Sequence, residues 1–331
     1  MPAPSSRIPL PPAPAIARAD LLPGAPQGDG TPWQPALLVR EQTATPADRA
    51  RPVLFVHGAT FPSDCALMYR FGGVSWADAL NRAGFAAFAF DFAGFGGSER
   101  YPAMGPRTPP AGTPLGRADH AAGQIARVVD AVLARTGAGR LSIIAHSWGS
   151  IAAGLFATRH PRLVDRLVFF GPIMRRSQLT TEPALGPWRL VSVDEQLRRF
   201  TEDVPLGAAP VLERDDVPAW AQRYLDSDPT SRSRTPPSVK TPNGPVADIA
   251  AAWAGRLAYD PARIQAPVAV IRGAWDSLCT DADAAWLHAA LSSTTMRDVT
   301  VPRGTHLMHL ERGRHALYDA ANAFLSEGRT P

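Results

Sequence analysis

A chain of 331 residues is long enough for two domains, or for one α/β domain that carries an insertion. Its 45% hydrophobic content is ordinary for a globular protein, and its formal net charge of +4 comes from charges scattered along the chain. No basic run alternates with aromatic residues, which disfavours nucleic-acid binding. The only lysine, Lys240, lies in a proline-rich stretch, which disfavours a Schiff-base mechanism.

The two cysteines, Cys65 and Cys279, are too few for a disulfide framework, and no Cys/His spacing is typical of a metal site. We therefore expect two free, buried cysteines and no metal. The first 20 residues are rich in proline and alanine and lack the continuous apolar segment of a signal peptide. No run reaches the roughly 18 apolar residues of a membrane span. These features predict a soluble, cytoplasmic protein, and they leave its oligomeric state open.

Residues 1–32 contain many prolines and glycines and no periodic pattern, which predicts an N-terminal arm. The arm is expected either to be disordered or to pack along a sheet edge or cap of a neighbouring subunit. From residue 33 onward, short apolar runs typical of buried strands alternate with helical patterns. The expected strands are 52–58, 85–91, 141–146, 167–171, 266–273 and 297–302. The expected helices are 74–84, which Gly84 should end, 119–136, 281–291 and 310–325.

This alternation predicts an α/β fold with a doubly wound, mostly parallel sheet, whose core comprises residues 33–171 and 267–331. The intervening segment, 172–266, has roughly 95 residues, far more than the ~12 that a strand crossover needs. It contains helical stretches and a loop rich in helix breakers at 228–245. We expect it to form a helical cap, or lid, between the sixth and seventh core strands. Open α/β sheets bind ligands at the strand ends that such a cap would cover.

Ser147 stands at the abrupt join between an apolar strand and a helix, in "IIAHSWGSIAAG". The small residues Ala145 and Gly149 flank it at two-residue spacing. A sharp strand-turn-helix brings neighbouring backbone so close that only small side chains fit beside the serine. A serine N-cap is the simpler interpretation of the same residues. The pattern resembles the G-x-S-x-G nucleophile elbow of the α/β-hydrolase superfamily, with alanine in place of the first glycine.

The resemblance implies a catalytic triad in the order serine, acid, histidine. Asp276 in "GAWD" and His306 in "PRGTHLMH" follow the two last predicted strands, where that superfamily places its acid and histidine. Asp281 and His309 are the nearest rivals. Asp281 looks like the first turn of a helix, where an acid is favoured by the helix dipole, and His309 begins a helical pattern.

The same resemblance implies an oxyanion hole made by the backbone N–H groups of Trp148 and Ala59. The loop after "FVHG" and the residues beside the triad predict a substrate pocket at Thr60, Phe61, Trp275 and His146. The long aromatic loop and the cap together indicate an enclosed, largely apolar pocket.

Three residues near these turns have simpler interpretations. His57 flanks a tight glycine turn, as His146 flanks the elbow, and both are interpreted as structural histidines. The segment "DFAGFGGSE" (91–99) resembles the superfamily's D-x-x-G-x-G-x-S turn, so Asp91 is interpreted as a carboxylate that stabilises a turn.

The predicted function is hydrolysis of a moderate-sized, largely apolar carboxylic ester through an acyl-enzyme, with a small molecule as the only partner and no cofactor. The "SWGS" stretch also resembles the elbow of proline iminopeptidases, although "HGAT" departs from their H-G-G-P-G loop. An aminopeptidase or other amidase, a thioesterase and a lactonase therefore remain alternatives on the same triad. From other classes, an acyltransferase, a lyase or a non-catalytic ligand receptor would use the same pocket.

Overall fold

The computed structural model describes residues 14–27, 33–105, 108, 111–177, 183–213, 215–292 and 295–328. Eight strands form one twisted sheet in the order β1-β2-β4-β3-β5-β6-β9-β10. The first two strands are antiparallel to their neighbours and the others are parallel. The strands are β1 (Ile16–Leu22), β2 (Leu37–Thr43), β3 (Pro52–Val56), β4 (Ala86–Phe90), β5 (Leu141–His146), β6 (Val164–Phe170), β9 (Val268–Gly273) and β10 (Met296–Val301).

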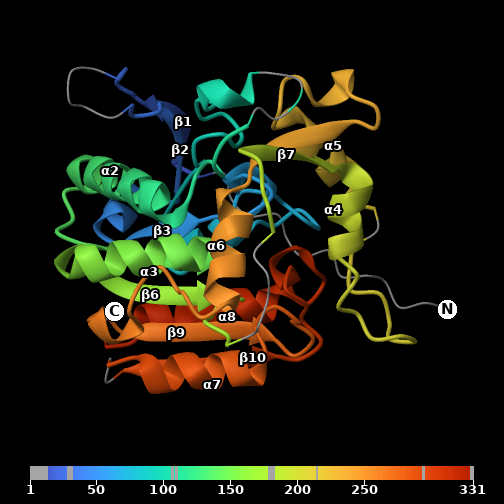
Figure 1. Ribbon diagram of the computed structural model, residues 1–331. Coiled ribbons are helices and arrows are strands. Elements are labelled where there is room, and N and C mark those ends of the chain that lie inside the picture. The colour runs from blue at the N-terminus through green and yellow to red at the C-terminus, as the bar shows by residue number, and fades with distance from the viewer. Residues whose placement is uncertain are drawn as a thin grey trace.

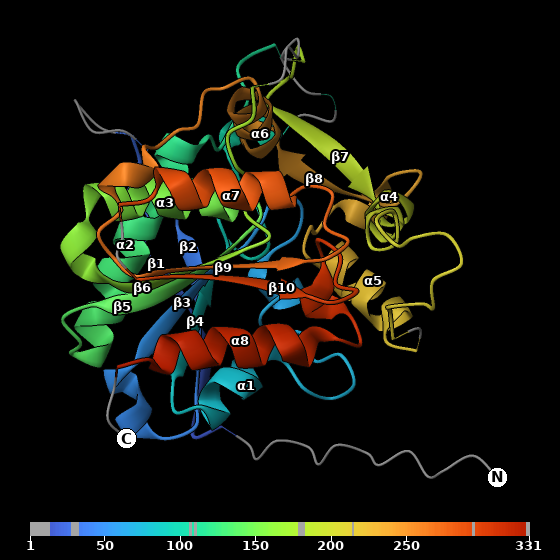
Figure 2. The same cartoon turned by 90° about the horizontal axis from the view of Figure 1, so that it is seen from below.

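Helices cover both faces of this sheet (Figures 1 and 2). One face carries α1 (Trp76–Arg82) and α8 (Arg314–Ser326). The other carries α2 (Ala118–Thr136), α3 (Gly149–Arg159) and α7 (Asp281–Ala290). The central strands β3, β4 and β5 are buried along their whole length, because helices exclude water from both faces. The predicted α/β fold is confirmed.

Strand β1 lies within the stretch 1–32, for which the sequence predicts an extended or disordered arm. The structure instead adds Ile16–Leu22 to the edge of the chain's own sheet, antiparallel to β2. Most β1 side chains are exposed or half-buried, so the strand lacks the apolar alternation that would reveal it. An ion pair reinforces the pairing, because Arg18 Nε donates to Oε2 of the buried Glu41 at 2.9 Å. Residues 1–13 and 28–32 of the predicted arm lie outside the described residues.

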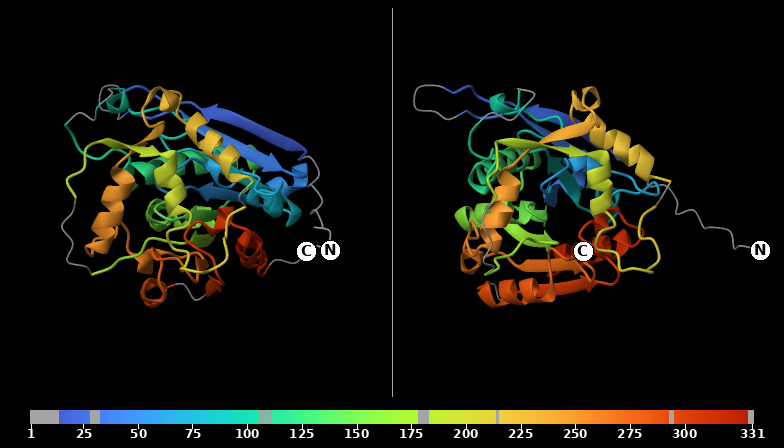
Figure 3. Two further views of the ribbon diagram at one scale, coloured as in Figure 1. Left: turned by 90° about the vertical axis from the view of Figure 1, so that its right-hand side faces the viewer. Right: turned by 45° about the vertical axis from the view of Figure 1, so that its right-hand side comes forward.

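The segment between β6 and β9 contains helices α4 (Val193–Arg199), α5 (Val217–Asp226) and α6 (Gly244–Trp253). It also contains a two-stranded antiparallel ribbon of β7 (Trp188–Ser192) and β8 (Ser238–Pro242). The three helices agree with the expected helical cap, to which the ribbon is an addition, and the expectation of a loop throughout 228–245 is wrong. Prolines flank and end β8, and only its pairing with β7, far away in the sequence, makes it a strand. Figure 3 shows this segment along one side of the core, with β7 and β8 running between α6 and α4.

Aromatic side chains attach α5 to the loop that follows β3. The ring of Trp220 packs edge-on against Phe61, with 5.4 Å between centroids, and stacks on Tyr224 at 5.4 Å. The Trp220 indole N–H donates to the carbonyl oxygen of Cys65 at 2.9 Å. These buried contacts hold the segment above the carboxyl ends of the strands, where the candidate site lies. In the part of the chain that the structure describes, no helix combines the length and apolar character that crossing a bilayer requires.

Candidate active site

Ser147 occupies a strained turn between β5 and α3. Its φ is +55°, in the left-handed region, which costs a residue other than glycine about 1–3 kcal/mol. The N–H of Ser147 donates to the carbonyl oxygen of Phe170 at 3.0 Å, which ties the turn to β6. A Cβ on Gly149 would lie 2.5 Å from the carbonyl oxygen of His57. The close approach of the β3 loop therefore explains why a glycine follows two residues after the serine.

A continuous hydrogen-bond chain joins Ser147, His306 and Asp276. The Oγ of Ser147 lies 2.8 Å from Nε2 of His306, and Nδ1 of His306 lies 3.0 Å from both carboxylate oxygens of Asp276. All three side chains are buried. Because a carboxylate only accepts hydrogen bonds, Nδ1 carries the proton, and Nε2 is left to accept the hydroxyl proton of Ser147.

The backbone fixes the acid and leaves room for it. The backbone N–H groups of Leu278 and Cys279 donate to Oδ1 of Asp276 at 2.9 and 3.0 Å. Gly171, directly after β6, has a φ of +49°, and a Cβ there would lie 2.9 Å from Oδ2 of Asp276 and 3.1 Å from Nδ1 of His306. Sequence reasoning missed the role of Gly171, although a glycine that ends the strand beside the elbow is a usable signal.

Two backbone N–H groups are available beside Ser147. Among the described residues, no protein acceptor is hydrogen-bonded to the N–H of Ala59 or of Trp148. Ala59 lines the same cavity as Ser147, and Trp148 is the next residue of the elbow. Helix α3 begins at Gly149, so the positive end of its dipole also lies at the serine. The arrangement can stabilise negative charge that develops on an oxygen near Ser147.

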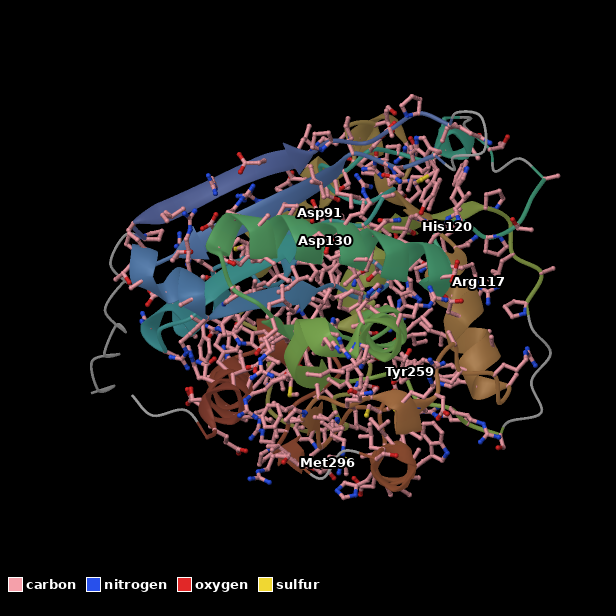
Figure 4. All side chains as sticks on the ribbon, turned by 90° about the vertical axis from the view of Figure 1, so that its left-hand side faces the viewer. Asp91, Arg117, His120, Asp130, Tyr259 and Met296 are labelled. Atoms are coloured by element: carbon pink, nitrogen blue, oxygen red, sulfur yellow. The ribbon has the colours of Figure 1, made fainter. Side chains whose placement is uncertain are left out.

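The indole of Trp148 connects the elbow to helix α6. Its Nε1–H donates to Oδ2 of Asp248 at 3.0 Å. The same carboxylate accepts the N–H of Ala118 at 2.7 Å and Nε of Arg117 at 2.5 Å, both at the start of α2. Figure 4 shows Arg117 at this end of α2, beside α6. Asp248 therefore joins three elements at the residue that follows Ser147, and sequence reasoning missed it, although it is the one acid in an alanine-rich helix.

A cavity of about 220 Å³ contains Ser147 and His306. Three of the residues predicted for the substrate pocket, Thr60, Phe61 and His146, line it. Apolar side chains from α6 and from the loops after β9 and β10 form much of the remaining wall: Val246, Ile249, Trp253, Leu278 and Leu307. Arg189 and Arg199 complete it, and neither was predicted.

The prediction that Trp275 lines the pocket is wrong. Its N–H bonds to the carbonyl oxygen of Gly304 at 2.9 Å, in the turn that directs the neighbouring Asp276 inward. The guanidinium of Arg303 stands over the Trp275 ring at 5.5 Å, and Trp275 is not among the described residues that line the cavity. Consecutive side chains in this turn thus face opposite ways.

Comparison with protein families shows which family the chain belongs to. Residues 52–313 match the family model described as serine aminopeptidase, S33, which is most of the chain. The chain is an α/β-hydrolase of this family. A search of curated protein sequences gave no match.

Many solved structures share the fold of this hydrolase. One is the thioesterase domain from the curacin biosynthetic pathway, 15% identical, with 94% of this chain and 99% of that one covered and a TM-score of 0.58. A monoacylglycerol lipase from Paleococcus ferrophilus is 19% identical, with 87% and 98% covered and a TM-score of 0.56. An enol-lactonase from Burkholderia xenovorans is 17% identical, with 92% and 100% covered and a TM-score of 0.57. At these identities, the likeness establishes the fold alone.

Three other histidines of the hydrolase lie buried near Ser147, His306 and Asp276. Nδ1 of His57 donates to the carbonyl oxygen of Gly58 at 2.8 Å, and its Nε2 accepts the N–H of Phe92 at 3.0 Å. Burial lowers the pKa of His57 to about 4, so this ring is a neutral turn support, as interpreted from the sequence. Nε2 of His146 donates to the carbonyl oxygen of His306 at 3.1 Å, and burial lowers its pKa. His309 stacks on Phe61, 6.1 Å between centroids, and burial lowers its pKa to about 3.

The remaining candidates have structural positions. Asp91 binds the N–H and hydroxyl of Ser63 at 3.0 and 2.7 Å and Nη1 of Arg40 at 2.8 Å, in agreement with its interpretation as a turn carboxylate (Figure 4). Asp281, the rival acid, lies at the start of α7 and pairs with Arg272 at the surface. The two cysteines are free and buried. Burial raises the pKa of Cys279, and likewise that of Cys65, which disfavours a thiolate at either position.

Proposed function

We propose that this α/β-hydrolase cleaves a small carboxylic ester, with Ser147 as the nucleophile, His306 as the general base and acid, and Asp276 as the group that orients His306. The observation that supports this most is the hydrogen-bond chain of 2.8 and 3.0 Å from Ser147 Oγ through the His306 ring to the Asp276 carboxylate. A hydroxyl is a weak nucleophile unless a base removes its proton as it attacks.

In the first half of the reaction, His306 Nε2 takes the hydroxyl proton while Ser147 Oγ bonds to the substrate carbonyl carbon. The carbonyl oxygen becomes an oxyanion, which the N–H groups of Ala59 and Trp148 stabilise by hydrogen bonds. Asp276 stabilises the imidazolium through Nδ1–H. The intermediate then collapses, and His306 gives its proton to the departing alkoxide, which leaves as an alcohol.

In the second half, water replaces the alcohol. His306 removes a proton from the water, and the hydroxide oxygen bonds to the acyl carbon of the acyl-enzyme. Collapse of the second oxyanion returns the proton to Ser147 Oγ and releases a carboxylic acid. The two halves together consume one ester and one water molecule and give one acid and one alcohol.

The charge of the cavity supports an ester over a peptide with a free amino terminus. A protonated amine needs a carboxylate or a set of carbonyl oxygens as its partner. The cavity wall contains two arginines, and no aspartate or glutamate is among the described residues that line it. Two guanidinium groups would repel an ammonium group, so we place the aminopeptidase activity behind ester cleavage. Thioesters and lactones pass through the same oxyanion, and a thioesterase and an enol-lactonase are among the structural neighbours.

Hydrolysis of a panel of p-nitrophenyl esters and of an aminoacyl p-nitroanilide tests the proposal. We expect ester cleavage by the wild type and a loss of at least about 10⁴-fold in kcat/KM in Ser147→Ala, because the residual activity of a serine hydrolase without its nucleophile is small. Ser277→Ala, an exposed serine beside Asp276, is the matched control and should retain full activity. Cleavage of the anilide in preference to every ester would overturn the ester assignment.

A further inference from the structure

Two arginines from the inserted segment share a cavity with the proposed nucleophile. Arg189 lies on β7 and Arg199 at the end of α4, and both line the cavity of about 220 Å³ that contains Ser147 and His306. Both residues belong to the inserted segment between β6 and β9 rather than to the core. They are the only charged side chains other than histidine among the described lining residues.

Neither guanidinium has an adequate partner in the described part of the chain. Nη1 of Arg189 donates to the side-chain oxygen of Asn243 at 3.0 Å, and no described carboxylate lies within 4.0 Å of it. Arg199 has only Glu202, at 3.9 Å and half-exposed. By contrast, the half-buried Arg176, outside the cavity, meets the carboxylate of Asp283 at 2.6 Å. Burial lowers the pKa of Arg189, and the positive charge of Arg199 adds to this effect.

A purely structural role accounts for only part of this arrangement. The bond from Arg189 to Asn243 helps to fix the residue that precedes α6, whose side chains line the cavity. It uses one of the five donors of the guanidinium, and it explains nothing about Arg199. Two like charges beside one cavity repel each other, and removing them from water costs free energy unless an anion neutralises them.

We propose that Arg189 and Arg199 bind a carboxylate of the substrate, so that the enzyme prefers esters that carry a second, free acid group. This inference rests on the proposed ester hydrolysis. The apolar wall of Val246, Ile249 and Trp253 fits a short hydrocarbon spacer between the ester carbonyl and the carboxylate. In this proposal the substrate is apolar along the spacer, as the sequence predicts, but it carries a negative charge at the end of the spacer. Arginine suits this task because its planar donors match the two oxygens of a carboxylate.

A pair of esters of equal chain length tests the preference. The probes are p-nitrophenyl hydrogen glutarate, whose acyl chain ends in a carboxylate, and p-nitrophenyl pentanoate, whose chain ends in a methyl group. We expect the ratio of their kcat/KM values, glutarate over pentanoate, to be roughly 10 to 100 in the wild type, as for charge-assisted hydrogen bonds. The ratio should fall about tenfold in Arg189→Gln and in Arg199→Gln, and Arg189→Lys should recover part of it.

Arg198→Gln is the matched control, because Arg198 lies on the same helical turn with its side chain exposed and outside the cavity. Its ratio should equal that of the wild type. Equal ratios in the wild type, Arg189→Gln and Arg199→Gln would overturn the carboxylate site while the ester hydrolase stands. Melting temperatures of the variants identify any that fail to fold.

Calorimetric titration with glutarate separates this proposal from ester hydrolysis, because it needs no turnover. It is carried out on Ser147→Ala with and without Arg189→Gln. Binding of glutarate that weakens about tenfold in the double variant supports the carboxylate site even if neither ester is hydrolysed. Absence of glutarate binding at millimolar concentration in Ser147→Ala, with neither ester hydrolysed, would overturn both proposals.

Discussion

The proposed triad and the two cavity arginines are held in different ways, although Ser147, His306, Arg189 and Arg199 line the same cavity. Asp276 and His306 follow β9 and β10, and backbone N–H groups and a glycine contact fix the acid to the core sheet. Arg189 and Arg199 project from a two-stranded ribbon and a two-turn helix, and both are half-buried. The core thus presents rigid reacting groups, whereas the inserted segment presents longer side chains that a substrate can still reposition.

This difference separates the chemistry of the site from its selectivity. Groups that transfer protons must be placed to within a fraction of an ångström, which rigid strand ends can achieve. Groups that recognise a charge tolerate more freedom, because a guanidinium offers several donors. Variants in the core should therefore abolish turnover, whereas variants in the inserted segment should change which ester is preferred.

Among the variants considered, Asp276→Asn in the core should cause the largest loss of turnover. The amide oxygen can keep the bonds from Leu278 and Cys279, which turns the amide NH₂ toward His306. Nδ1 must then accept a hydrogen bond, so the proton moves to Nε2 and the ring can no longer accept the proton of Ser147. We expect kcat to fall about 10⁴-fold with little loss of stability.

Ester hydrolysis and the melting temperature measure the two effects. Asp281→Asn is the matched control, because Asp281, at the start of α7, is 92% exposed at the side chain and among the described residues pairs only with Arg272. Its activity should equal that of the wild type. If Asp276→Asn kept more than a tenth of wild-type kcat, the orienting role of Asp276 would be refuted.

Asp248→Asn should have an intermediate effect, because it weakens the connection between α6 of the inserted segment and the core. An asparagine retains one acceptor oxygen where the carboxylate has two, so the bond to Arg117 or to Trp148 is lost. We expect the free energy of unfolding to fall by about 1–3 kcal/mol and kcat/KM to fall about tenfold.

Trp148→Phe separates the contribution of the bond between Trp148 and Asp248 from that of the bond between Arg117 and Asp248. It removes the indole N–H together with part of the buried ring and leaves the contact between Asp248 and Arg117 in place, so it should reproduce the loss of kcat/KM. Chemical denaturation and ester kinetics on both variants give the comparison. Wild-type kinetics in both variants would show that the inserted segment does not influence the elbow through Asp248.

Glu311→Gln should have the smallest effect on turnover, and its effect on stability should depend on pH. Burial raises the pKa of Glu311 to about 7, although the hydroxyl and the N–H of Thr305 donate to its carboxyl group. Because the ordinary value is 4.5, the folded state binds more protons than the unfolded state between pH 4.5 and 7, and stability falls as pH rises through that window. The loss is on the order of 3 kcal/mol at most.

Glutamine has no proton to lose and can still accept the bond from Thr305. The stability of Glu311→Gln relative to the wild type should therefore increase as pH rises from 5 to 8. Denaturation curves at several pH values measure the difference. A difference that stays constant over this range would contradict the raised pKa of Glu311.

The strands and helices that the sequence predicts well are those whose local pattern agrees with their burial. β5 carries an unbroken apolar run, α2 has apolar residues at helical spacing, and Gly137, at φ +72°, ends α2 where the pattern stops. Ser147, Asp276 and His306 were predictable as candidates because each follows a strand that the sequence predicts. The strand β1 and the strand β8 were not, since exposed or proline-flanked strands depend on a partner that is distant in the sequence.

The same reasoning explains the missed site residues. Asp248 reaches Trp148 from 100 positions away, and Arg189 meets Asn243 across the β7–β8 ribbon. No local periodicity predicts such contacts, because the packing of the inserted segment on the core decides them. Trp275 was misplaced for a related reason, since the direction of its side chain depends on the bond from its N–H to Gly304.

Reaction with a fluorophosphonate, followed by intact mass and peptide mapping, tests most directly whether Ser147 is the activated nucleophile. We predict one adduct, on the peptide that contains Ser147, with none in Ser147→Ala and slower labelling in His306→Ala. An adduct on a different residue, or no adduct on folded wild-type protein, would contradict the proposed serine hydrolase.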